Sequence, residues 1–195
     1  MVSELGFEVP TWNDIYNMLI DLADKVRVKN FKPDILVGIS RGGWLPTRVL
    51  SDLLENPSIT SVGAAFYVGI YETENEPVLT QPLSISAFDK KILLVDDVVD
   101  TGKSAMLIRS LIDREGAKEI KLLTIYYKPW SIVRPDFYSK ETSDWIVFPW
   151  EIKETLRKLK EKWKGKTELF MEATSRLVKS GVSKELIERL LKEIS

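Results

Sequence analysis

The segment from Ile92 to Ser104 restricts the possible folds of this chain more than any other. Four apolar residues lead directly into two adjacent carboxylates, Asp96 and Asp97, and an Asp-Thr-Gly-Lys-Ser turn then opens a helical stretch. A short apolar run bounded by turn residues is typical of a buried strand. Because the first N–H groups of a helix attract anions, the turn is suited to hold a phosphate. The segment therefore predicts a strand, a ligand-binding loop and a helix.

The same succession occurs earlier in the chain, which predicts the class of fold. Ile35–Ile39 is apolar enough for a buried strand, and a Ser-Arg-Gly-Gly turn and a helix follow it. Strands that alternate with helices indicate an α/β fold with a mainly parallel sheet flanked by helices, and ligands bind such sheets beyond the carboxyl ends of the strands. Thr11 and Asp14 are spaced as a capping box for the first helix. The elements expected here are helices over 11–29, 45–54 and 103–115, strands over 35–39, 61–71, 91–95 and 119–127, and a loop over 96–102.

The last part of the chain predicts a small helical appendage. Three amphipathic helices are expected over 152–164, 167–179 and 184–194, separated by Gly165 and Gly181, with Thr167 and Ser183 as caps. The first of these helices is basic, but glutamates interrupt its lysines, which is typical of a solvated face. We therefore predict a core domain over 1–151 and a C-terminal helical bundle over 152–195.

The 195 residues include no cysteine and no histidine, which excludes several kinds of chemistry. Disulfides, thiolate nucleophiles, zinc sites built on cysteine or histidine, and a Ser-His-Asp triad are all impossible. Catalysis must use carboxylates, Lys, Arg, Tyr, backbone dipoles or an oxygen-bound cation such as Mg²⁺. The net charge of -1 argues against a dedicated nucleic-acid binder. Because no apolar run approaches the ~20 residues of a membrane span, we expect a soluble, cytoplasmic protein.

Other phosphate-binding motifs do not fit the two turns. A P-loop that ends in Gly102-Lys103-Ser104 would need glycine at position 97, which is Asp97. The dinucleotide fingerprint fails at the first turn, because Ser40 stands where the second glycine after Gly38 is required. A response-regulator site would need a further Asp and a Lys at later strand ends, and neither spacing is met.

The segment Ile92–Ser104 resembles the ribose-phosphate motif of the type I phosphoribosyltransferases. In that family, the acids at the positions of Asp96 and Asp97 contact the ribose hydroxyls and lie near the metal. The resemblance implies that Asp100 is the catalytic general acid/base beside the purine N7. It also implies that the loop binds the phosphate of 5-phosphoribosyl-1-pyrophosphate (PRPP) through Asp100, Thr101, Gly102, Lys103 and Ser104.

The first turn and the segment over 128–151 extend this resemblance. Ser40, Arg41 and Gly42 match the pyrophosphate loop, in the Ser-Arg-Gly-Gly form of the xanthine–guanine enzymes. The segment over 128–151 resembles the base site of 6-oxopurine enzymes. There Lys128 would donate to the exocyclic oxygen, Trp145 would stack on the purine, the backbone at Ile146 would read the base edge, and Glu151 would lie toward Mg²⁺ and pyrophosphate.

One segment departs from the family pattern. The family has a mobile hood loop over the reaction centre, which corresponds to about residues 67–83, and its usual Ser-Tyr pair is absent here. No Lys or Arg occurs between Arg48 and Lys90, so this hood carries no cation for pyrophosphate. Mg²⁺ and Arg41, or a partner subunit, would have to neutralise the charge. A homodimer is usual in the family and is expected.

The resemblance implies transfer of a phosphoribosyl group from PRPP to N9 of a purine base, which gives a nucleoside monophosphate and pyrophosphate. The residues leave two kinds of base open. The appended helices and the Phe-Pro-Trp-Glu segment resemble archaeal adenine enzymes and favour adenine, whereas Lys128 fits a 6-oxopurine such as hypoxanthine, guanine or xanthine. Two other classes are open: a nucleic-acid-binding regulator on the same fold, and a helical interaction module on an inactive core.

Overall fold

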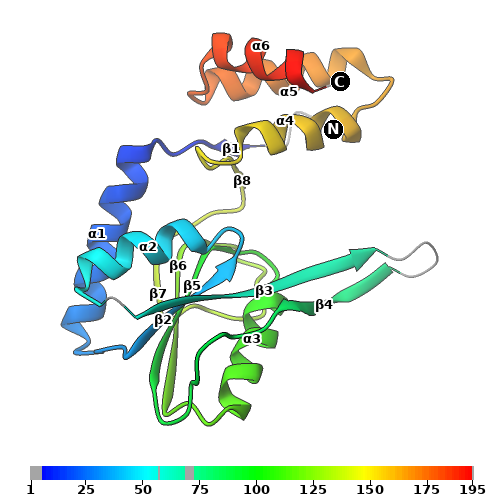
Figure 1. Cartoon of the computed structure of the whole chain (residues 1–195). Coiled ribbons are helices and arrows are strands. Elements are labelled where there is room, and N and C mark those ends of the chain that lie inside the picture. The colour runs from blue at the N-terminus through cyan, green and yellow to red at the C-terminus, as the bar shows by residue number, and fades with distance from the viewer. Residues whose placement is uncertain (1–5, 57, 69–72, 195) are drawn as a thin grey trace. The chain divides into compact units, whose positions relative to one another are not determined.

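The computed structural model describes residues 6–56, 58–68 and 73–194 (Figure 1). The chain divides into two compact units, which are described separately. One spans residues 16–142 and contains the main sheet; the other combines residues 1–15 with residues 143–195. The predicted core domain ended at residue 151, so the contacts divide the chain nine residues earlier and group the N-terminal segment with the last helices. In the described ranges, no helix is both long and apolar enough to cross a membrane.

The sheet unit has the predicted α/β architecture. Its strands lie in the order β4-β3-β2-β5-β6-β7, and all neighbouring pairs are parallel except β3 with β4. Figure 1 shows α2 and α3 on opposite sides of this sheet. The elements are α1 Trp12–Val28, β2 Ile35–Ser40, α2 Trp44–Leu53, β3 Ile59–Val68, β4 Thr73–Gln81, β5 Lys91–Val99, α3 Lys103–Arg114, β6 Glu119–Tyr127 and β7 Phe137–Glu141.

The core follows from the alternation of side chains along the strands. Ile92 and Leu94 of β5 are fully buried, and they pack in one cluster with Ile108 and Ile112 of α3. Leu93 is equally buried but points to the opposite face, because successive side chains of a strand alternate. Both faces of β5 are therefore covered, which is typical of a parallel sheet with helices on each side.

Three elements differ from the sequence-based expectation. The prediction ended β5 at Val95, but the strand continues to Val99, because Val98 and Val99 pair with Tyr126 and Tyr127 of β6. The acidic stretch after residue 72, expected as a hood, forms β4 and pairs antiparallel with β3. Residues 69–72 of the expected hood lie outside the described residues. Strand β7 was not predicted, because Phe137–Glu141 carries little apolar alternation.

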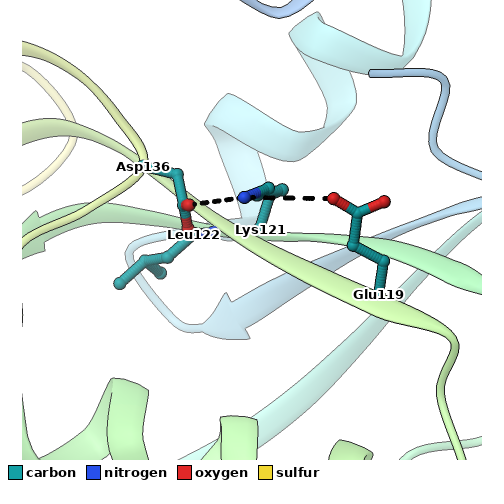
Figure 2. A network of polar contacts seen from close by, with 4 residues as sticks. All are labelled: Glu119, Lys121, Leu122 and Asp136. Atoms are coloured by element: carbon teal, nitrogen blue, oxygen red, sulfur yellow. Dashed lines mark hydrogen bonds and ion pairs between the residues drawn. The ribbon is translucent and has the colours of Figure 1, made fainter. Parts of the chain in front are cut away.

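Strand β7 is joined to β6 through a group of charged residues at the amino ends of both strands (Figure 2). The Lys121 Nζ lies 3.0 Å from Asp136 Oδ1 and 3.9 Å from Glu119 Oε1. The other Asp136 oxygen accepts a hydrogen bond of 2.8 Å from the Leu122 N–H. We call Glu119, Lys121 and Asp136 the amino-edge network. One carboxylate thus pairs with a cation and satisfies a backbone donor.

The second unit contains a two-stranded parallel sheet, β1 Phe7–Glu8 with β8 Trp145–Ile146, and the helices α4 Ile152–Lys162, α5 Thr167–Lys179 and α6 Lys184–Glu193. The three helices confirm the predicted appendage. Ser183 accepts a hydrogen bond from the Leu186 N–H, as a cap should. The predicted cap at Thr167 is wrong, because that residue is already helical and Lys166 precedes it without a side-chain cap. The predicted capping box is confirmed, since Thr11 and Asp14 exchange hydrogen bonds.

Candidate functional site

Three loops of the sheet unit leave the same edge of the sheet. Strands β2, β5 and β6 are parallel neighbours, so their carboxyl ends at Ser40, Val99 and Tyr127 lie side by side. Strand β3 follows β2 in the chain and lies on one side of it, whereas β5 lies on its other side. The strand order therefore reverses between β2 and β5. Ligands of open α/β sheets bind at such points. The edge collects the predicted site residues of this unit, namely Ser40, Arg41, Gly42, Asp96, Asp97, Asp100, Thr101, Gly102, Lys103, Ser104 and Lys128.

The two adjacent acids lie within β5 and are withdrawn from solvent. Asp97 is 6% exposed, and Asp96 is half-buried. The Asp97 N–H donates to Asp96 Oδ1 at 3.0 Å, and the Val98 N–H donates to Asp97 Oδ1 at 2.7 Å. Burial raises the pKa of the Asp96 carboxyl well above its ordinary value of 3.8, and the negative charge of Asp97 raises it further. Two adjacent carboxylates favour a ligand that donates hydrogen bonds from its hydroxyl groups or that carries a cation.

The turn after β2 packs directly against these acids. A Cβ added to Gly42 would lie 2.2 Å from Asp97 Oδ1, and one added to Gly43 would lie 2.2 Å from the Val95 carbonyl oxygen. Only glycine fits such close approaches. The turn also contains a cis peptide bond between Ser40 and Arg41. The Ser-Arg-Gly-Gly sequence thus brings the predicted pyrophosphate loop into contact with the predicted ribose-binding acids.

The loop after β5 presents the start of α3. Gly102 is its N-cap in the left-handed conformation, with φ of 83°, and has no side chain to cap the helix; the Thr101 hydroxyl accepts only a long bond of 3.4 Å from the Lys103 N–H. The first N–H groups of a helix have no partner within the helix and carry the positive end of its dipole. A Cβ at Gly102 would lie 2.7 Å from Ser131 Oγ, so the loop packs closely on the segment after β6. These features suit the predicted phosphate site.

The segment after β6 adds a residue that the sequence analysis missed. The Trp130 indole N–H donates a hydrogen bond of 2.8 Å to Asp100 Oδ1. The ammonium of Lys128 lies 5.6 Å from the centre of the Trp130 ring, and Lys128 is only 6% exposed. The only available signal was the position of a tryptophan two residues after the predicted base-binding lysine.

The remaining predicted residues lie in the second unit, where they share one segment. Trp145 is 42% exposed, and the Lys158 ammonium lies 5.9 Å from its ring centre. The N–H groups of Trp145 and Val147 donate to the carbonyls of Gly6 and Glu8, so the backbone groups of Ile146 between them point away from β1. Glu151 is the half-buried residue that precedes α4. The base-binding and metal roles of this segment stay predictions.

The acid pair suits Mg²⁺ as a site completed by substrate. Mg²⁺ in proteins is usually held by one or two carboxylates together with substrate phosphates. Asp96 and Asp97 supply two oxygen ligands at the sheet edge. Within residues 6–56, 58–68 and 73–194, no three acidic residues gather closely enough to form a metal cage by themselves. The donors that the sheet unit offers therefore fit a cation that arrives with a pyrophosphate substrate.

Comparison with known proteins agrees with this geometry. The sequence profile of the phosphoribosyl transferase domain matches residues 10–155. The xanthine-guanine phosphoribosyltransferase of Cereibacter sphaeroides is 32% identical over 157 residues, which are 76% of this chain and 89% of the relative. That of Gluconobacter oxydans is 29% identical over 143 residues, which are 72% and 82% of the two chains.

A solved structure is similar over most of its length. The purine phosphoribosyltransferase from Pyrococcus horikoshii has a TM-score of 0.69 and 36% sequence identity, and the match covers 75% of this chain and 94% of that one. The fold and the three loops define a phosphoribosyltransferase-type site. This chain belongs to the phosphoribosyl transferase family, as the profile match over residues 10–155 and the 32% identical relative show.

Proposed function

We propose that this purine phosphoribosyltransferase transfers the 5-phosphoribosyl group of PRPP to N9 of a 6-oxopurine. One observation carries the choice of base. The buried Lys128 follows directly on the strand next to β5, and its ammonium and the Asp100 carboxylate contact the same indole ring. A cationic donor beside the general acid/base matches a purine edge with an oxygen acceptor, whereas the adenine amino group offers none.

The relatives support the same base and not the adenine preference of the sequence analysis. Both curated relatives described above are named for xanthine and guanine, and the Pyrococcus horikoshii structure is named only for purine. The adenine preference depended on the appended helices, which lie almost entirely beyond the matched residues 10–155, and on the Phe-Pro-Trp-Glu segment over 148–151. We therefore place the 6-oxopurine alternative first.

The proposed mechanism assigns one task to each loop. The N–H groups of Thr101–Ser104 hold the 5-phosphate, and Asp96 and Asp97 accept hydrogen bonds from the ribose hydroxyls. N9 of the base forms a bond to C1 while the bond from C1 to the pyrophosphate oxygen breaks and its electron pair leaves with pyrophosphate. Asp100 takes the proton that the base releases at N7. The Ser40–Gly42 turn and Arg41 stabilise the leaving charge. Mg²⁺, held by the acid pair and the substrate, would supply further charge neutralisation.

The base is tested by direct competition. Purified enzyme is given PRPP, Mg²⁺ and equal concentrations of adenine, hypoxanthine, guanine and xanthine, and the nucleotides are separated by chromatography. We expect a product from one or more of the 6-oxopurines and little AMP. AMP as the main product would reject this choice of base and restore adenine. No product from any base, together with salt-sensitive binding of RNA or DNA, would favour the regulator.

We also infer that the active protein is a homodimer, because the hood over about residues 67–83 lacks a cation for pyrophosphate. The proposed substrates, PRPP and a purine base, support a cytoplasmic location. The oligomeric state is measurable by light scattering. If a partner subunit supplies that cation, specific activity should fall on dilution as the dimer dissociates, and a monomer with full specific activity would contradict the inference.

A further inference from the structure

We propose that Trp130 is a positioning residue that fixes Asp100 and Lys128 relative to each other, and so sets the spacing between the groups that read N7 and the exocyclic oxygen of the base. The inference rests on the proposed function. It concerns a side chain that the resemblance to the family did not assign.

Core packing does not explain the position of Trp130. The residue is 54% exposed, whereas the large core side chains of the sheet unit are almost fully buried. Its indole N–H makes a 2.8 Å hydrogen bond to Asp100 Oδ1. Hydrogen bonds to an ionised carboxylate are stronger than those between neutral groups. The contact restricts the rotation of a side chain that otherwise lies exposed at the start of the phosphate loop.

The face of the same ring meets a cation. The Lys128 Nζ lies 5.6 Å from the ring centre, within the range of a cation–π interaction. Lys128 is 6% exposed, so this ammonium has little freedom to move into solvent. The edge of one rigid side chain therefore contacts the Asp100 carboxylate, and its face contacts the Lys128 ammonium. An indole has two rotatable side-chain bonds, so few degrees of freedom separate the two charged groups.

The backbone around Trp130 is tied to the end of β5. The Lys128 N–H donates to the Val99 carbonyl at 3.0 Å, and the Ile132 N–H donates to the Thr101 carbonyl at 3.1 Å. Between these two bonds, the Ser131 N–H closes a turn on the Lys128 carbonyl at 3.0 Å. The backbone on both sides of Trp130 is therefore held by Val99 and Thr101, the residues on either side of Asp100.

The purine edge explains what this spacing serves. The exocyclic O6 and the N7 of guanine lie side by side on one edge of the base, and both are acceptors in the neutral nucleotide. Lys128 is proposed to donate to O6, and Asp100 to exchange a proton at N7. Both contacts must form at once in the transition state, so a fixed separation between the two side chains favours turnover.

Two substitutions separate the two contacts of Trp130. Trp130→Phe keeps an aromatic face for Lys128 and removes the N–H donor to Asp100. We expect kcat to fall about tenfold, the scale of one hydrogen bond to a charged group, with the KM for the base nearly unchanged. Trp130→Ala removes both contacts, and we expect it also to raise the KM for the base about threefold or more. The KM for PRPP should not move in either variant.

The matched control is Trp12→Phe, which changes another exposed tryptophan that has no assigned role in the site and keeps an aromatic ring against Trp150. It should leave kcat and both KM values at wild-type levels. Thermal melts of all variants check folding, and we expect small changes because Trp130 is exposed. Wild-type kinetics for Trp130→Phe and Trp130→Ala, in an enzyme whose wild type is active, would overturn the inference.

A spectroscopic measurement tests the geometry without turnover. In a ¹H–¹⁵N spectrum, the indole resonance missing from Trp130→Phe identifies Trp130. Asp100→Ala should shift this resonance upfield as the hydrogen bond to the carboxylate is lost, while the resonance of Trp12 stays in place. An unmoved Trp130 resonance would overturn the inference. If the wild type turns over no purine but this shift appears, the proposed function fails and the contact stands.

Discussion

The two edges of the main sheet handle charge in opposite ways. At the amino ends of β6 and β7, the amino-edge network places Lys121 between the carboxylates of Glu119 and Asp136 (Figure 2). At the carboxyl end of β5, Asp96 and Asp97 are adjacent like charges, and burial raises the pKa of Asp96. The first arrangement pairs opposite charges within the fold. The second needs a ligand to become favourable, which is typical of a functional site.

The difference also separates stability from function. Asp136 accepts a hydrogen bond from the backbone N–H of a fully buried residue, Leu122. Removing the Asp136 side chain would leave that N–H without an acceptor and so lower the free energy of unfolding. Ionised Asp96, in contrast, destabilises the folded chain, because burial and the charge of Asp97 disfavour its negative form. We therefore expect substitutions at the amino edge to change stability and leave catalysis alone, and substitutions at the carboxyl edge to change substrate binding or catalysis, whatever they do to stability.

The largest expected effect is at Asp100. Replacing it by Ala should lower kcat by ~10²–10⁴, the range for loss of a positioned general acid or base. The exposed side chain contributes little to folding, so the melting temperature should stay close to that of the wild type. Steady-state kinetics and a thermal melt measure the two quantities. Turnover near the wild-type rate would remove Asp100 from the mechanism.

The next largest effect is expected at Gly42, whose backbone packs against Asp97. Gly42→Ala would place its Cβ 2.2 Å from the buried Asp97 carboxylate, which already accepts a bond from the Val98 N–H. Forced shifts of this kind cost ~1–3 kcal/mol. We expect a higher KM for PRPP, with a smaller effect on the KM for the base. Gly165→Ala is a useful control for backbone strain, because Gly165 has φ of 75° but no atom within 4 Å of its added Cβ.

At the amino edge, Asp136→Ala should destabilise the fold by ~1–3 kcal/mol, because it leaves the buried Leu122 N–H without an acceptor. Chemical denaturation measures this change. Asp136→Asn keeps an oxygen for that N–H and should recover part of the loss. Both variants should retain wild-type kcat/KM for PRPP and base. A loss of activity without a loss of stability would contradict the separation of the two edges.

The smallest expected effect is a gain in stability on replacing Asp96. The folded-state pKa of Asp96 lies above 3.8, so ionisation destabilises the folded chain as the pH rises through that raised pKa. Asp96→Asn removes this cost, and we expect the melting temperature at pH 7 to rise by ~2–4 °C, as for about 1 kcal/mol in a chain of this size. The gain should shrink as the pH falls toward 3.8. A lower melting temperature at pH 7 would show that the ionised Asp96 stabilises the folded chain, which contradicts this expectation.

Local patterns predicted much of the fold. The apolar runs located β2, β5 and β6, and the capping residues Thr11 and Ser183 are confirmed by their hydrogen bonds. The extension of β5 to Val99 was missed because it depends on pairing with Tyr126 and Tyr127, a contact that is distant in sequence. Strand β4 was missed for the same reason, because an acidic stretch gains strand structure only through its partner β3.

The candidate site shows the same limit. The motif assigned Asp96, Asp97 and Asp100 through resemblance, and the parallel order of β2, β5 and β6 brings their loops to one edge. The contact of Gly42 with Asp97 and the bridge through Trp130 could not be predicted, because both join segments more than 25 residues apart. Such close approaches depend on how the loops pack and not on any local spacing.

The central claim is that the carboxyl end of β5 and the start of α3 hold a ribose 5-phosphate. A crystal structure with a bound nucleoside 5′-monophosphate tests it most directly. We predict phosphate oxygens within hydrogen-bond distance of the N–H groups of Thr101–Ser104, and ribose hydroxyls on Asp96 and Asp97. A well-ordered nucleotide whose phosphate lies elsewhere, with no ligand at this loop, would contradict the account.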